Sequence, residues 1–83
     1  MTYQFKPKGI CARGISIELD GDIIRHVNFD GGCAGNLMGI SKLVEGMHAG
    51  DVIKKFKGTR CGYKSTSCPD QLSQALEEAM LNS

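Results

Sequence analysis

The period of the hydrophobic pattern changes once along this chain, near its middle. Between residues 15 and 30 apolar side chains alternate with polar ones, whereas from Leu37 onward they recur every three to four residues. A period of two is typical of a half-buried strand, and a period near 3.6 is typical of an amphipathic helix. We therefore expect strands in the first part of the chain and helices in the second, which is the order of an α+β domain.

Three strands are expected before the change of period. Residues 2–6 predict a short edge strand that Pro7 ends, because proline cannot donate a hydrogen bond to a neighbouring strand. Residues 15–19 predict the next strand, and Asp20-Gly21 after it is a favoured two-residue hairpin turn. The return strand covers residues 23–30. We expect its inner face to carry Ile23, Val27 and Phe29.

Three helices are expected after the change of period. The first runs from Leu37 to a stop at Gly46, and the second begins at Asp51, a good N-cap residue, and ends before residue 58. The third starts at Cys68-Pro69. Its buried stripe is expected to consist of Leu72, Ala75, Leu76, Ala79 and Met80. The order β-β-β-α-α-α predicts one domain, residues 1–83, with a small three-stranded antiparallel sheet and two to three helices packed on one face.

The chain is short and rich in glycine, with eleven glycines and no tryptophan in 83 residues. A domain of this size has a small core and often needs a metal ion, a disulfide or a partner subunit for stability. Its formal net charge of +1 argues against a strongly basic nucleic-acid-binding protein. Neither a secretory signal pattern nor a run of 18 apolar residues occurs, so we expect a cytoplasmic protein that does not enter a membrane.

The candidates for chemistry are four cysteines, Cys11, Cys33, Cys61 and Cys68. None forms the Cys-x-x-Cys pair of a zinc knuckle. Glycines stand near them, which lets backbone amides approach a sulfur atom. Cys33 and Cys68 fall at expected helix starts, where the helix dipole favours the thiolate, the form that binds metal. We expect the four thiolates to bind one Zn²⁺ ion and so stabilise a chain with little core; an iron–sulfur cluster also accepts four cysteines.

The residues alone leave other interpretations open. The thiols can be buried without a shared ligand, act in redox or nucleophilic chemistry, or form disulfides. His26 and His48 are candidate replacements for a cysteine ligand. The segment from Gly31 to Asn36 joins a strand to a helix, as phosphate-binding loops do, but it lacks the ending of a Walker loop. The basic stretch 54–64 is expected to be a solvated helix face rather than a nucleic-acid contact.

Several motifs resemble one family over nearly the whole chain. They are Thr66-Ser67-Cys68-Pro69-Asp70, the following Gln71-Leu72 and Ala75-Leu76, and the upstream runs Gly32-Cys33-Ala34-Gly35-Asn36, Ile40-Ser41-Lys42-Leu43 and Cys61-Gly62. The first run spells the name of the TSCPD domain, and the set resembles the small, free-standing branch of that family with four cysteines. Ser73 stands where alanine is usual in the motif.

The resemblance implies a metal or thiol role for Cys33, Cys61 and Cys68, with Cys11 as the fourth cysteine of the branch. Larger members of the family are adenosylcobalamin-dependent ribonucleotide reductases, so a ribonucleotide reductase or another protein is the implied partner. The radical chemistry of those enzymes needs a cofactor-bearing barrel that 83 residues cannot form. We therefore expect a metal-binding module that is not an autonomous enzyme. The alternative is a reductase-associated accessory protein with redox-active cysteines or nucleotide binding at Gly31 to Asn36.

Overall fold

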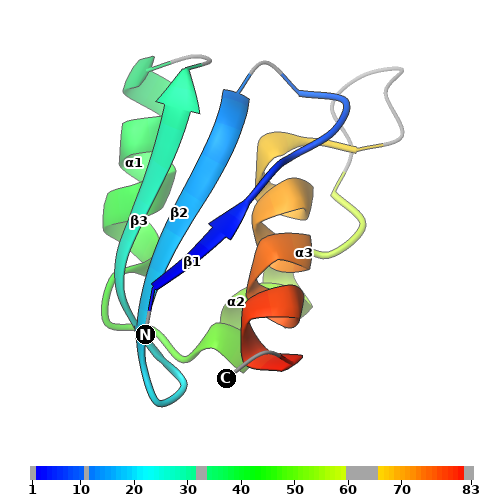
Figure 1. Cartoon of the computed structure of the whole chain (residues 1–83). Coiled ribbons are helices and arrows are strands. Elements are labelled where there is room, and N and C mark those ends of the chain that lie inside the picture. Colours follow the sequence, from blue (N-terminus) through cyan, green and yellow to red (C-terminus); the bar gives the residue numbers. More distant parts are fainter. Residues whose placement is uncertain (1, 11, 32–33, 60–65, 82–83) are drawn as a thin grey trace.

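The computed structural model describes residues 2–10, 12–31, 34–59 and 66–81. Its elements follow the predicted order of three strands and then three helices (Figure 1). They are β1 (Thr2–Phe5), β2 (Ala12–Asp20), β3 (Ile23–Gly31), α1 (Ala34–Val44), α2 (Ala49–Phe56) and α3 (Cys68–Leu81). The change of hydrophobic period thus coincides with the passage from β3 to α1, and the α+β prediction is confirmed.

The strands form one antiparallel sheet in the order β1-β2-β3. Ile17 in the central strand pairs with Tyr3 on one side and Val27 on the other. The hairpin between β2 and β3 is shifted by one residue from the prediction, because its two turn residues are Gly21 and Asp22. Gly21 has a φ of 63°, which glycine adopts without steric cost.

A bulge in β3 corrects one predicted core position. Leu19 pairs with Ile24, and Glu18, the residue before Leu19 in β2, pairs with His26, so that Arg25 is an extra residue in β3. The extra residue changes which side chains face inward. Ile24 is fully buried, and Ile23, which simple alternation placed in the core, is only half-buried.

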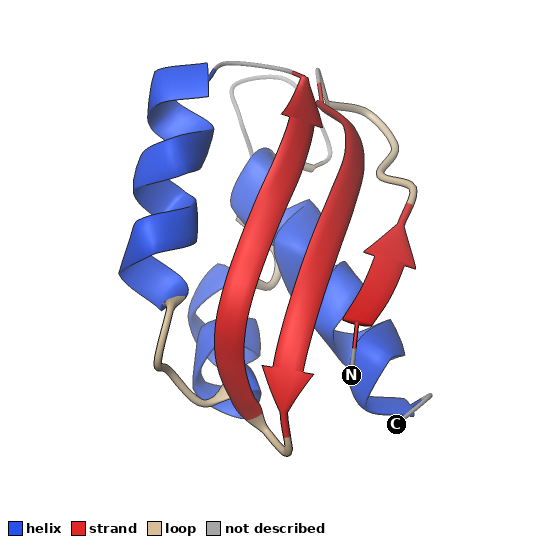
Figure 2. Ribbon diagram, turned by 60° about the vertical axis from the view of Figure 1, so that its left-hand side comes forward, coloured by secondary structure: helices blue, strands red, loops and turns tan. Residues whose placement is uncertain are grey.

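The core lies between the sheet and the helices, which cover one of its faces (Figure 2). Helix α3 packs on β1 and β2, α2 packs on α3, and α1 lies along β3. The fully buried apolar side chains from α3 are Leu72, Ala75, Leu76 and Ala79, as predicted. Met80 was expected in the same stripe, but its side chain lies at the rim and is 37% exposed. Asp51 is not the N-cap of α2 as predicted; it lies in the first turn, and His48 is the N-cap.

Candidate functional site

One of the four predicted ligands lies within the described residues. Cys68 is the first residue of α3 and is half-buried. Cys11, Cys33 and Cys61 lie outside the described residues. Among residues 2–10, 12–31, 34–59 and 66–81, no three histidine, cysteine or carboxylate side chains lie close enough to hold a metal ion. The geometry around the cysteines is therefore given by the described residues on either side of them in the chain.

Two of these flanks are neighbours in the sheet. Ala12, which follows Cys11 in sequence, opens β2 and pairs with Gly31, the last residue of β3. Helix α1 begins three residues later, at Ala34. In Figure 1 the start of β2, the end of β3 and the starts of α1 and α3 lie at the same end of the molecule. We call this the cysteine end.

The residues before position 11 contact the start of α3. The backbone N–H of Lys8 donates a hydrogen bond of 3.0 Å to the side-chain oxygen of Gln71. Gly9 lies so close to Thr66 that a Cβ atom added to it would stand 2.9 Å from the Thr66 Cγ2 atom. Gly9 also has a φ of 76°, a conformation that L side chains rarely adopt. Glycine is thus required at position 9 both by its positive φ and by the lack of room for a Cβ atom beside Thr66.

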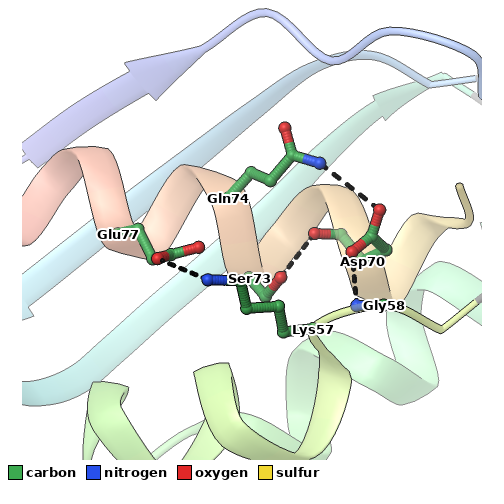
Figure 3. A network of polar contacts seen from close by, with 6 residues as sticks. All are labelled: Lys57, Gly58, Asp70, Ser73, Gln74 and Glu77. Carbon is green, nitrogen blue, oxygen red and sulfur yellow. Dashed lines mark hydrogen bonds and ion pairs between the residues drawn. The ribbon is translucent and has the colours of Figure 1, made fainter.

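A buried carboxylate joins the two ends of the segment between α2 and α3. Asp70 is 6% exposed, and its Oδ1 atom accepts a hydrogen bond of 2.7 Å from the backbone N–H of Gly58. Its Oδ2 atom accepts a bond of 2.5 Å from the hydroxyl of Thr66 and one of 3.3 Å from the amide of Gln74. Figure 3 shows Asp70 between Gly58 on one side and Gln74 on the other. Asp70 therefore holds both ends of the stretch that contains Cys61.

Ser67 adds a second tie across the same stretch. Its hydroxyl donates to the carbonyl oxygen of Thr59 at 2.6 Å and accepts from the backbone N–H of Asp70 at 3.2 Å. The second bond is that of an N-cap residue, because Asp70 is the third residue of α3. The Gln71 amide completes the cluster with a bond of 2.9 Å to the Thr66 hydroxyl.

We call these four buried residues the motif network: Thr66, Ser67, Asp70 and Gln71. A family model for the TSCPD domain matches residues 1–80. The chain belongs to the TSCPD domain family. Searches of curated proteins and of solved structures gave no match.

The structure assigns a role to each polar residue of the TSCPD motif. Thr66 and Asp70 bond each other, and Ser67 caps the helix that Cys68 begins. Pro69 takes the second helical position, where the missing N–H costs no intrahelical bond. Asp70 lies in the first turn of α3, where a carboxylate complements the helix dipole, but its bonds to Gly58 and Thr66 go beyond that local role. The spacing Ser67-x-x-Asp70, which resembles a capping box, is the sequence signal for the local part of the network.

The two histidines form contacts with carboxylates. His48 Nδ1 lies 2.9 Å from Asp22 Oδ2, beside the hairpin turn at the end of the molecule opposite the cysteine end (Figure 1). The hydrogen bond with Asp22 raises the pKa of His48, and the same bond lowers the pKa of Asp22. His26 Nδ1 lies 4.0 Å from Glu45 Oε1. His48 thus lies at the opposite end of the TSCPD fold from Cys68, and its Nδ1 atom contacts Asp22.

The other predicted sites are described in part. The segment 31–36 does join a strand to a helix, with Gly31 closing β3 and Ala34 opening α1, and nucleotide binding there stays a prediction. In the basic stretch, Lys54 and Lys55 are exposed and Lys57 Nζ lies 3.3 Å from Glu77 Oε2 on α3; residues 60–64 lie outside the described residues. No helix in the described part of the chain is long and apolar enough to span a membrane.

Proposed function

We propose that this TSCPD protein is a non-catalytic metal-binding module in which one Zn²⁺ ion is held by Cys11, Cys33, Cys61 and Cys68. The observation that carries the proposal is the convergence of their described flanks. Three contacts join these flanks: Gly31 pairs with Ala12 in the sheet, Gly9 lies against Thr66, and the Ser67 hydroxyl bonds the Thr59 carbonyl oxygen.

The donor chemistry fits the ion. Each cysteine stands within two residues of one of these anchored positions in the chain, and two residues span at most about 7 Å. Four thiolates are a common ligand set for a structural zinc site. Cys68 opens a helix of 14 residues, whose N-terminal amides and dipole favour a thiolate.

A bound zinc ion would supply cross-linking rather than catalysis. The core of this chain is built from small and medium side chains, with no buried aromatic ring among the described residues. A structural zinc ion contributes on the order of 10 kcal/mol of apparent folding free energy in small domains. The same four thiolates suit an iron–sulfur cluster, and the two cofactors differ in colour and in inorganic sulfide content.

The test is metal analysis of protein purified without added metal. We expect about one equivalent of zinc per chain, four thiols that react only after denaturation, and loss of helical signal on strong chelation. The variant Cys33→Ser should lower zinc content, whereas Ser41→Ala, which alters a hydroxyl on α1 away from the cysteines, should keep it. Less than about half an equivalent of any metal, together with a fold that survives chelator, would overturn the proposal.

A second candidate function is supported by the ties across residues 59–66. Asp70 and Ser67 bring the ends of the stretch containing Cys61 to the start of α3, where Cys68 lies. In this alternative the two thiols form a disulfide, passing two electrons and two protons to a disulfide of a partner such as a ribonucleotide reductase. Reaction with glutathione disulfide, followed by mass spectrometry, tests it. A disulfide between Cys61 and Cys68 supports the redox role, and unreacted thiols in metal-free protein argue against it.

A further inference from the structure

The two edges of the sheet differ in how much of the chain covers them. The edge formed by β3 is flanked by α1. Near the hairpin, the N–H of Ile24 donates to the Met47 carbonyl oxygen at 2.9 Å, and its carbonyl accepts from the Gly46 N–H at 2.7 Å. At the edge formed by β1, Figure 2 shows α3 behind the strand rather than beside it. No residue of β1 is buried, so this edge is accessible along its length.

The bonds of Ile24 determine the direction of the backbone groups in β2. Residues of a central strand direct their N–H and carbonyl groups alternately toward one neighbouring strand and the other. Ile24 uses its groups on the outer side of β3, so its partner Leu19 directs its own groups toward the β1 side. By alternation Ile17 and Ile15 also face β1, whereas the residues between them face β3.

In β1 the same alternation leaves every second residue with outward groups. Tyr3 and Phe5 pair with the two isoleucines that face them and therefore bond β2. Thr2 and Gln4 direct their N–H and carbonyl groups away from the sheet, and so does Lys6 when the alternation is continued. In the described part of the chain nothing bonds these outward groups.

The outward groups are spaced so that this segment can pair with itself. Pro7 ends the strand, which leaves residues 2–6 for pairing. An antiparallel pairing of two such segments centred on Gln4 places Thr2 opposite Lys6 of the second copy, and Gln4 opposite its own counterpart. Each outward N–H then meets an outward carbonyl. A shift by one residue would set outward groups against inward ones and lose these bonds.

The two ends of the segment carry opposite charges. At its start, the exposed Glu18 pairs with the first residue of β1, and Glu78 on α3 accepts a hydrogen bond of 3.1 Å from the Tyr3 hydroxyl. At its end, Lys6 and Lys8 are exposed. Antiparallel pairing of two copies sets the basic end of each beside the acidic end of the other, whereas parallel pairing sets like charges together.

These charges are not neutralised within one copy. Glu18, Lys6 and Lys8 form no ion pair with another described residue. The other charged side chains of the sheet near these ends are paired, Asp20 with Arg25 and Arg13 with Asp30. An acidic or a basic peptide on this edge would be attracted at one end and repelled at the other. A second copy of the chain satisfies both ends at once.

On the helix side of the sheet the same register pairs two aromatic rings. Tyr3 and Phe5 are half-buried and line a groove of about 390 Å³ between β1 and α3. The pairing brings Tyr3 opposite Phe5 of the second copy, and aromatic cross-strand pairs stabilise a sheet. We propose that two copies of this chain join their β1 strands antiparallel about Gln4, which continues the sheet across a two-fold axis. This pairing does not involve the cysteines.

On the outer face the pairing forms an ion pair between the copies. Lys6 of one copy stands opposite Thr2 of the other, and Glu18 is the next residue in that row. Two strand spacings of about 4.8 Å each separate the lysine from the glutamate, a distance that their side chains span across threonine. The paired segments are short, whereas stable interfaces bring roughly 20–30 residues from each side. We therefore expect a dimer that dissociates on dilution.

The test measures self-association of the full chain by sedimentation equilibrium, together with amide hydrogen exchange by NMR. We expect a monomer–dimer equilibrium, and slower exchange of the Gln4 amide as the protein concentration rises. Gln4→Pro removes the outward N–H in both copies and should weaken the dimer at least about tenfold. Gln4→Ala keeps that N–H and should change the dissociation constant by no more than about twofold.

A charge exchange makes the test independent of how well Gln4→Pro folds. Lys6→Glu and Glu18→Lys should each weaken self-association by about three- to tenfold, because each sets like charges together at both contacts. An equimolar mixture of the two variants should form a heterodimer about as strong as the wild-type dimer, since both contacts again join opposite charges. A chain that stays monomeric up to about 1 mM, a dimer that leaves the exchange of the Gln4 amide unchanged, or a mixture that associates no more strongly than its separate variants would each overturn the proposal.

Discussion

The two ends of this molecule hold their acidic groups in opposite ways. At the cysteine end, Asp70 is buried and accepts hydrogen bonds from Gly58, Thr66 and Gln74. At the hairpin end, Asp22 contacts His48 while more than half of each side chain is exposed. Solvent weakens an exposed pair, whereas a buried acceptor cannot be removed without leaving its donors unsatisfied. The comparison implies that the cysteine end depends on its polar network and the hairpin end does not.

The largest expected effect is that of removing the Asp70 carboxylate. Asp70→Ala leaves the Gly58 N–H and the Thr66 hydroxyl without their acceptor, and we expect it to lower the free energy of unfolding by about 3 kcal/mol. Asp70→Asn keeps an acceptor for one of them and should cost about half as much. Urea denaturation followed by circular dichroism measures both.

The matched control is Asp51→Ala, which removes an exposed acid from the first turn of α2 and should cost no more than about 0.5 kcal/mol. If Asp70→Ala were as mild as Asp51→Ala, the motif network would not stabilise the cysteine end, and the comparison between the two ends would fail.

A smaller effect is expected where a glycine contacts the motif network. Gly9→Ala adds strain at a φ of 76° and a close approach to Thr66, so we expect a loss of about 2 kcal/mol. Gly21→Ala, at the hairpin end, has a φ of 63° but no atom within 4 Å of the added Cβ, so it should cost about 1 kcal/mol from backbone strain alone.

Thr66→Ser separates the two contributions, since it removes the Cγ2 atom and keeps the hydroxyl. In that background the cost of Gly9→Ala should fall to about that of Gly21→Ala. Thermal or urea unfolding of wild type, Gly9→Ala, Thr66→Ser and the double variant gives the coupling energy between positions 9 and 66. Strictly additive effects of Gly9→Ala and Thr66→Ser would show that the close approach at the cysteine end carries no energy.

The order of elements was predictable because it depends on local periodicity. The predictions that were wrong, the inward face of β3 and the position of the hairpin turn, depend on how one strand pairs with another. The alternation in residues 15–19 located β2. In β3, Arg25 shares the parity of Ile23, Val27 and Phe29, but simple alternation did not predict the bulge there that buries Ile24 in place of Ile23. The hairpin turn was missed by one residue for a related reason: Asp20-Gly21 and Gly21-Asp22 both suit a tight turn, and strand pairing chooses between them.

In the candidate site, too, local features were predictable and contacts between distant residues were not. The cysteines and the helix start at Cys68 were visible in the sequence, as was membership of the family. The partners of Asp70 and Gln71 were not, because Gly58 is 12 residues away and Lys8 is 63 residues away in the chain. Residue type predicts that a buried carboxylate has donors, but only the fold determines which backbone amides supply them.

The smallest expected effect is a pH dependence at the hairpin end. The Asp22 contact raises the pKa of His48, so the stability that this contact contributes is fully present below the unfolded pKa of histidine, about 6.5, and is lost as pH rises through the folded pKa. The pKa of Asp22 is lowered by the same contact. The stability that the Asp22 carboxylate contributes is therefore present above its unfolded pKa and is lost as pH falls through its lowered, folded-state pKa. The contact is therefore worth most in weakly acidic solution.

His48→Gln should accordingly lower the melting temperature more at pH 5.5 than at pH 8.5 at low ionic strength, a window that lies on either side of the ordinary histidine pKa of about 6.5. For Asp22→Asn, the difference in melting temperature from wild type should likewise be smaller at pH 8.5 than at pH 5.5, because either substitution removes the ion pair. Added salt should shrink the difference at pH 5.5 and leave the effect of Asp70→Ala nearly unchanged, since screening acts on exposed charges and not on a buried acceptor. A pH-independent difference for His48→Gln would mean that the charge of His48 contributes no stability, and no difference at either pH would mean that the hairpin end is held by main-chain bonds alone.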